Sequence, residues 1–305
     1  MKLQTTIATA VLAAGFAATA LTGCGAQDNA PAPAPASPGA YADVNGLHMY
    51  YEVHGTPTAQ PPLVLLHGAL SGIGTDFGQL IPELSKTRQV IAVEQQAHGR
   101  TADIDRPLRT AQMAEDTVAL LRKIGVQQVD LFGYSMGAGV ALEITLKHPE
   151  LVRKQVLAAG GLNAGAMHPG LLEGLAQLKP ENLHGSPFHN DYLKNAPRPE
   201  DFPRLVQRVV EYDQNDLPNV APEAVRQAKE PTLTVIGDSD IIRPEHAVEM
   251  FRLFGGGIMG DTPAGLPNSQ LAILPGTTHV TLVHRPELLL PMIPAFLEAP
   301  VKDAQ

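Results

Sequence analysis

A serine enclosed by glycines stands near the middle of the chain, where residues 133–137 read G-Y-S-M-G with Ser135 at the centre. The residues before it, V-D-L-F, are typical of a short buried strand. The residues after it, A-G-V-A-L-E-I, are typical of the start of a helix. A very tight strand-to-helix turn exposes the hydroxyl of its central residue, and only glycines fit two residues to either side. The first helical amides then point to where an oxyanion forms. The alternative is an ordinary glycine-rich turn.

A nucleophilic serine needs a base, and the base needs a carboxylate that orients it. Two later turns supply both: G-D-S-D, which contains Asp238 and Asp240, and G-T-T-H, which ends at His279 and follows the last predicted strand. We predict Ser135, Asp240 and His279 as the catalytic residues. Asp238 and His284 are the alternatives for acid and base. The chain has 11 histidines, so a histidine by itself says little. We assign His279 as the base because it follows the final predicted strand.

These residues must be positioned by strands and helices that alternate along the chain. Asn45-Gly46 between two strand-like runs predicts a hairpin. The predicted strands are 41–44, 47–53, 62–66, 89–94, 129–132, 152–159, 231–237 and 270–274, and the predicted helices are 77–84, 110–124, the segment after Ser135, and 286–297. Strands that alternate with helices favour a mostly parallel sheet that is covered on both faces.

The alternation breaks between residues 160 and 229, where eight prolines separate short helical pieces. This stretch begins at the carboxyl end of a predicted strand, where open parallel sheets place their binding crevices. We therefore predict a helical cap over the site at about 162–229. A second, unrelated folded unit is the alternative.

Composition excludes several functions. The chain has 305 residues, a net charge of −9 and no basic block, which argues against a nucleic-acid partner. It contains neither H-E-x-x-H nor a phosphate-cradling loop, so we expect no metal and no cofactor.

The N-terminus indicates export. Residues 5–20 carry no charge and fit a signal-peptide core. The following L-T-G-C ends at Cys24, the only cysteine, and resembles the lipobox of bacterial lipoproteins. We predict a signal peptide at 1–23, lipidation of Cys24, an Ala/Pro-rich disordered tether at 24–40, and a folded domain at 41–300. A plain signal peptide with an incidental cysteine is the alternative.

Together these motifs resemble the α/β-hydrolase fold superfamily, in its branch of esterases, lactonases, C–C hydrolases and perhydrolases. The resemblance covers about residues 41–297 and includes H-G after the third predicted strand and H-G-R after the fourth. It implies a mostly parallel, eight-stranded sheet flanked by helices with an inserted helical cap, and it favours Asp240 over Asp238. It also implies that the backbone amides of Ala69 and Met136 form the oxyanion hole. The chain departs from the family pattern at Glu94, because many relatives have an aspartate at the end of the fourth strand. This difference affects a structural turn and not the triad.

The function that the resemblance implies is a cofactor-free serine hydrolase that cleaves a carboxylic ester or lactone through an acyl-enzyme. A C–C bond hydrolase or perhydrolase on the same triad, or a non-catalytic binding protein of this fold, is the alternative. We expect a small-molecule substrate, a membrane contact through lipidated Cys24, and a catalytic domain outside the cytoplasm, anchored to the bacterial cell envelope membrane.

Overall fold

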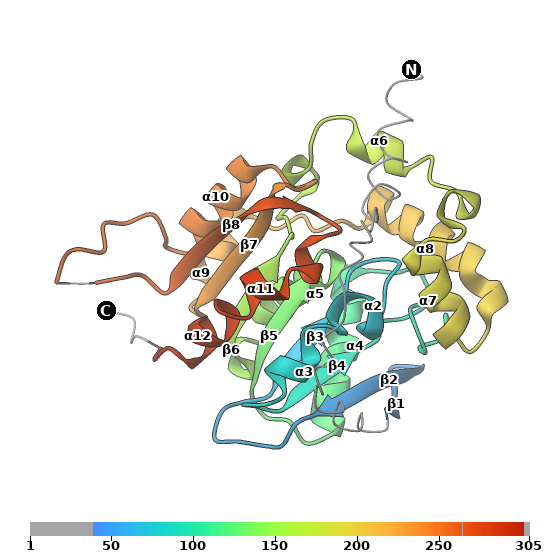
Figure 1. Ribbon diagram of the computed structural model, residues 1–305, viewed down its shortest axis with the longest axis horizontal. Coiled ribbons are helices and arrows are strands. Elements are labelled where there is room, and N and C mark those ends of the chain that lie inside the picture. The colour runs from blue at the N-terminus through green and yellow to red at the C-terminus, as the bar shows by residue number, and fades with distance from the viewer. Residues whose placement is uncertain (1–38, 264, 302–305) are drawn as a thin grey trace, which may run out of the picture.

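The apolar runs of the sequence become the centre of one eight-stranded sheet, which Figure 1 shows with helices on both faces. The computed structural model describes residues 39–263 and 265–301. The predicted signal peptide, Cys24 and all of the tether up to residue 38 lie outside these residues. The strands are β1 (Ala40–Val44), β2 (Leu47–His54), β3 (Leu63–Leu66), β4 (Val90–Val93), β5 (Val129–Tyr134), β6 (Val152–Ala158), β7 (Thr232–Ser239) and β8 (Ser269–Thr278).

The strand order across the sheet is β1-β2-β4-β3-β5-β6-β7-β8. The β1–β2 and β2–β4 pairs are antiparallel, and the other pairs are parallel. This confirms the predicted mostly parallel sheet. Parallel strands end at the same edge, so the turns after β5, β7 and β8 meet there.

The strand pleat explains why helices cover both faces. On β3, Val64 and Leu66 pack into one apolar cluster, whereas Leu63 and Leu65 pack into the other. Strands that are buried on both faces carry continuous apolar runs instead of alternating ones. The fully buried central strand β3 therefore has helices packed on both of its faces.

Most helices form one layer on each face of the sheet, and those between β6 and β7 form a separate group that is described below. The helices are α2 (Ile73–Phe77), α3 (Ile81–Leu84), α4 (Thr110–Lys123), α5 (Met136–Lys147), α6 (Leu171–Leu175), α7 (Pro187–Asn195), α8 (Phe202–Asn215), α9 (Pro222–Gln227), α10 (Pro244–Leu253), α11 (Pro286–Leu289) and α12 (Ile293–Glu298). Short 3₁₀ turns lie at η2 (Pro149–Leu151), η3 (Ala164–Ala166), η4 (Pro180–Leu183), η5 (Pro199–Asp201) and η6 (Leu282–His284). Buried apolar residues of α4 and α5, with Met250 of α10, belong to one cluster, and those of α2, α3, α11 and α12 belong to another. Ala247 of α10 lies in a small third cluster.

Three predicted elements differ from the structure. The helix predicted at 77–84 begins too early, because α2 ends at Phe77 and α3 occupies only Ile81–Leu84. The closing helix predicted at 286–297 is divided into α11 and α12, with Pro291 in the turn between them. Strand β8 runs four residues beyond its predicted end at 274, because residues 275–278 continue beside the end of β7.

The segment predicted as a cap contains α6, α7, α8 and α9, between β6 and β7. Figure 1 shows α6, α7 and α8 grouped beyond one end of the sheet. The apolar residues of α8, among them Val206 and Val209, face inward and are buried. Within residues 39–263 and 265–301, no helix has the length and apolar character needed to cross a membrane.

Candidate active site

Ser135 occupies the tight turn between β5 and α5. Its backbone has φ +54° and ψ −117°, a conformation that is strained for a residue with a side chain. A Cβ atom at Gly133 would lie 2.2 Å from the Gly137 carbonyl oxygen, and one at Gly137 would lie 2.0 Å from that of Leu66. Both positions therefore require glycine for lack of space. The structure has the strand–turn–helix context that the G-x-S-x-G pattern predicts.

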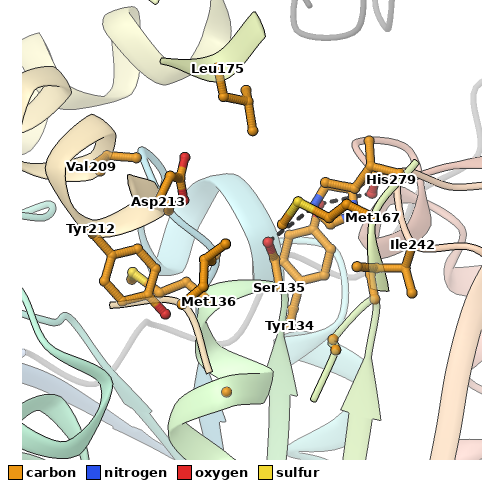
Figure 2. Close-up of a pocket in the computed structure, with 18 of the residues that line it drawn as sticks. Tyr134, Ser135, Met136, Met167, Leu175, Val209, Tyr212, Asp213, Ile242 and His279 are labelled. Carbon is orange, nitrogen blue, oxygen red and sulfur yellow. Dashed lines mark hydrogen bonds between the residues drawn. The ribbon is translucent and has the colours of Figure 1, made fainter. Parts of the chain in front are cut away.

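The three predicted catalytic side chains come together in one hydrogen-bonded chain, drawn in part in Figure 2. His279 Nε2 lies 2.9 Å from Ser135 Oγ, and His279 Nδ1 lies 2.8 Å from Asp240 Oδ1. The Asp240 carboxylate is fully buried and also accepts the backbone N–H groups of Ile242 (3.1 Å) and Gly237 (3.3 Å). A carboxylate that is held on both oxygens can fix the imidazole with Nε2 free to accept the serine proton.

The two alternative residues lie elsewhere. Asp238 is exposed and accepts the N–H groups of Gly276 (2.9 Å) and Thr277 (3.1 Å), which lowers its pKa. His284 lines a different surface pocket, between α2 and α7. The geometry therefore favours Asp240 and His279 over these two alternatives.

The loop after β3 carries Ala69, and the first turn of α5 carries Met136. Both residues line the cavity that contains Ser135. Among residues 39–263 and 265–301, neither amide has a hydrogen-bond acceptor within the protein. Both are thus available to a ligand oxygen, with the positive end of the α5 dipole behind Met136.

A buried carboxyl that the sequence analysis missed holds this loop. Asp76 Oδ2 accepts the Gly68 N–H at 2.8 Å and the Ser71 hydroxyl at 2.6 Å. Burial raises the pKa of Asp76 to about 6. Since Gly68 precedes Ala69, Asp76 fixes the backbone from which the Ala69 amide projects. Its signal in the sequence is weak, because an aspartate in a short helix is usually exposed.

His67 braces the same loop from the other side. Its Nδ1 donates to the Gly68 carbonyl at 2.7 Å, and its Nε2 accepts the Gln95 N–H at 3.0 Å. Burial lowers the pKa of His67 to about 3, so the ring is neutral near pH 7. The imidazole therefore links the loop after β3 to the end of β4 instead of taking part in proton transfer.

A cavity lies above Ser135, and the empty space within and in front of it amounts to about 1020 Å³, open solvent included. Its walls are mostly apolar and include Met167, Leu175 and Val209, which Figure 2 shows around the serine. One charged group interrupts them: Asp213 of α8, which points into the cavity. The sequence analysis missed Asp213, although its spacing of four residues from Val209 and seven from Val206 places it on the apolar face of α8.

No group of three or more His, Cys, Asp or Glu side chains in the described part of the chain has an arrangement that could hold a metal ion.

Comparison with known proteins gives the family. A model of the alpha/beta hydrolase fold matches residues 61–285. The chain belongs to the α/β-hydrolase fold family.

Two curated relatives extend over different lengths of this α/β-hydrolase. It is 27% identical over 278 residues to the uncharacterized hydrolase YugF of Bacillus subtilis (strain 168), an alignment that covers 84% of this chain and 96% of that protein. It is 33% identical over 117 residues to the 2-hydroxymuconate semialdehyde hydrolase of a Pseudomonas species, which covers 37% of this chain and 40% of that enzyme.

The fold is also found in solved structures. An alpha/beta hydrolase from a Medee basin deep-sea metagenome library has a TM-score of 0.68 at 18% identity, with 87% of this chain and 100% of that chain covered. At this identity the likeness shows the fold alone. The α/β-hydrolase architecture and membership of a hydrolase family are thus established, whereas the roles of individual site residues remain predictions.

Proposed function

We propose that the protein is a serine hydrolase that cleaves a carboxylic ester or lactone through an acyl-enzyme. The observation that carries the proposal is the unbroken hydrogen-bonded chain from Ser135 Oγ through His279 to Asp240, at the floor of an apolar cavity. This arrangement of nucleophile, base and orienting acid has the roles and geometry that acyl transfer requires.

In the proposed first half-reaction, Ser135 Oγ attacks the carbonyl carbon while His279 Nε2 takes the hydroxyl proton. The Asp240 carboxylate holds the ring and stabilises the imidazolium that forms. The carbonyl oxygen becomes an oxyanion, which accepts hydrogen bonds from the Ala69 and Met136 amides. Each such donor lowers the barrier by about 3 kcal/mol in comparable sites.

The tetrahedral intermediate collapses when the C–O bond to the alcohol breaks and His279 donates its proton to the leaving oxygen. The acyl group then remains on Ser135. A water molecule attacks the acyl carbon as His279 takes one of its protons, and His279 returns that proton to Ser135 when the acid leaves. A lactone follows the same steps, but its alcohol remains attached to the acyl group.

A C–C bond hydrolase is the second candidate, and the relative named 2-hydroxymuconate semialdehyde hydrolase favours it. The experiment that separates the two is hydrolysis of a p-nitrophenyl ester series and of γ- and δ-lactones by the full-length protein. We expect ester or lactone turnover in the wild type and a loss of at least about 10,000-fold in kcat for Ser135→Ala. A folded protein that turns over neither substrate type but cleaves 2-hydroxymuconate semialdehyde would show that the second candidate is correct.

We also propose that lipidated Cys24 anchors this hydrolase to the cell envelope membrane, with the catalytic domain outside the cytoplasm. The support is the L-T-G-C sequence after an uncharged apolar run. We expect the wild type to fractionate with membranes and to gain the mass of its acyl chains, and we expect Cys24→Ser to lose both properties. A Cys24→Ser protein that still sediments with membranes would contradict the anchor.

A further inference from the structure

A single carboxyl stands on the wall of the Ser135 cavity. Helix α8 turns its apolar face inward, and Val206, Val209 and Tyr212 on that face are buried. Asp213 lies on the same face and its side chain points from α8 into the cavity, as Figure 2 shows. Of the described residues that line the cavity, Asp213 is the one carboxylic acid.

The Asp213 carboxyl has no partner within the protein. Among residues 39–263 and 265–301, it makes no hydrogen bond and no ion pair, and no lysine or arginine of this part of the chain lines the cavity. Burial raises the pKa of Asp213 to about 7, whereas the electrostatic attraction of the His279 ring lowers the same pKa by a smaller amount. The cavity thus presents a half-buried acceptor without a protein partner, to which a ligand group can bind.

Helix α8 is held firmly where it carries this carboxyl. The residues on either side of the position bind the start of α4: Tyr212 Oη lies 3.0 Å from Thr110 Oγ1, and Asp216 Oδ2 accepts the Thr110 N–H at 2.7 Å. One turn earlier, Arg208 Nε donates to Asp103 at 3.1 Å. Since α8 is fixed on both sides of Asp213, the carboxyl is preorganised to receive a ligand group.

We propose that Asp213 forms a polar subsite that binds a primary ammonium group of the substrate, on the part that extends from the scissile carbonyl toward α8. This inference rests on the proposed ester or lactone hydrolysis at Ser135. Two observations favour a cation over a neutral donor. Among the described residues no lysine or arginine lines the cavity, and the chain carries a net charge of −9, which raises the concentration of cations near its surface.

The test is the ratio of kcat/KM values for two matched esters that differ by one ammonium group, p-nitrophenyl 6-aminohexanoate and p-nitrophenyl hexanoate. We expect Asp213→Asn to lower this ratio about tenfold to a hundredfold, because a hydrogen bond between charged groups is replaced by a weaker one. The control is Glu211→Gln, which removes the same charge from the outer side of α8 and should leave the ratio unchanged.

Three results would overturn the inference. The first is an equal ratio in wild type and Asp213→Asn. The second is the same fall in Glu211→Gln, since the effect would then come from net charge. The third is an equally large fall in a second ratio, that of p-nitrophenyl 6-hydroxyhexanoate to p-nitrophenyl hexanoate, because the subsite would then recognise a neutral donor.

A binding measurement separates failure of this subsite from failure of the proposed function. If none of the esters is hydrolysed, the thermal midpoint of the full-length protein is measured with hexylammonium and with hexanol. We expect hexylammonium to raise the midpoint of the wild type and of Glu211→Gln more than that of Asp213→Asn, whereas hexanol should act on all three alike. Equal shifts with hexylammonium would overturn the subsite whatever the reaction is.

Discussion

Replacing Asp240 with asparagine tests the part of the site that the sequence left open. The carboxylate accepts three hydrogen bonds: His279 Nδ1 at 2.8 Å and the Ile242 N–H at 3.1 Å on Oδ1, and the Gly237 N–H at 3.3 Å on Oδ2. An asparagine amide has only one oxygen to accept them. Either orientation of the amide therefore places its NH₂ group against a backbone N–H.

The orientation decides the chemistry. If the amide oxygen faces Gly237, the NH₂ group donates to His279 Nδ1, and the ring proton moves to Nε2. That tautomer cannot accept the Ser135 proton. By comparison with serine hydrolases in general, we expect kcat to fall about 1,000- to 10,000-fold, which is about 4–5.5 kcal/mol in the activation barrier. Stability should fall by about 1–3 kcal/mol, the cost of one unpaired buried donor.

The assay is kcat and kcat/KM for a p-nitrophenyl ester, with circular dichroism to show that Asp240→Asn is folded. The matched control is Asp238→Asn, which removes the same charge two residues away but does not touch His279. We expect Asp238→Asn to remain within about threefold of the wild type, because it changes only exposed or partly buried hydrogen bonds that do not involve the catalytic side chains. If Asp240→Asn retained more than a tenth of the activity, or if Asp238→Asn lost more than Asp240→Asn, the assignment of Asp240 would be refuted.

Further predictions concern the turn and the loop beside the serine. Gly137→Ala places a Cβ 2.0 Å from the Leu66 carbonyl oxygen, so activity should fall at least about 100-fold; wild-type kinetics would contradict this. Burial raises the pKa of Asp76 from 3.8 to about 6, so the stability it contributes is present below about pH 4 and is lost as the pH rises through 6. Urea unfolding should therefore show Asp76→Asn gaining about 1–3 kcal/mol over the wild type between pH 4 and 7, and a pH-independent difference would refute the shift. Asp76→Leu leaves the Gly68 N–H unpaired, although the Ser71 hydroxyl can still donate to the Gly68 carbonyl, and it should lower kcat by at least about tenfold in the same ester assay. An unchanged kcat would show that the loop does not depend on Asp76.

The sheet could be predicted because its strands carry their own signal. The run L-V-L-L at β3 is buried on both faces, and the G-x-S-x-G turn follows β5 as its spacing requires. The positions of Asp240 and His279 after β7 and β8 follow from the same alternation, since parallel strands deliver their carboxyl ends to one edge. The sequence could thus indicate which residues meet, because the topology brings them together.

Details that depend on packing could not be predicted in this way. The division of residues 73–84 into α2 and α3 depends on how the chain turns at Gly78, and a periodic apolar pattern does not report such a turn. Asp76 and Asp213 are acidic residues that ordinarily face solvent, and only the packed structure shows them turned inward. For Asp213 a signal was present, since it continues the apolar face of α8, but the prolines of the segment concealed that helix.

The most direct test of a nucleophilic Ser135 is whether this residue alone becomes covalently modified by a serine-reactive phosphonylating agent. The full-length wild type and Ser135→Ala are treated with a fluorophosphonate, which mimics the tetrahedral intermediate, and the digested proteins are analysed by mass spectrometry. We predict one stoichiometric adduct, on the peptide that contains Ser135, and none in the folded variant. A folded wild type that is never modified, or an adduct that persists in Ser135→Ala, would contradict a nucleophilic Ser135.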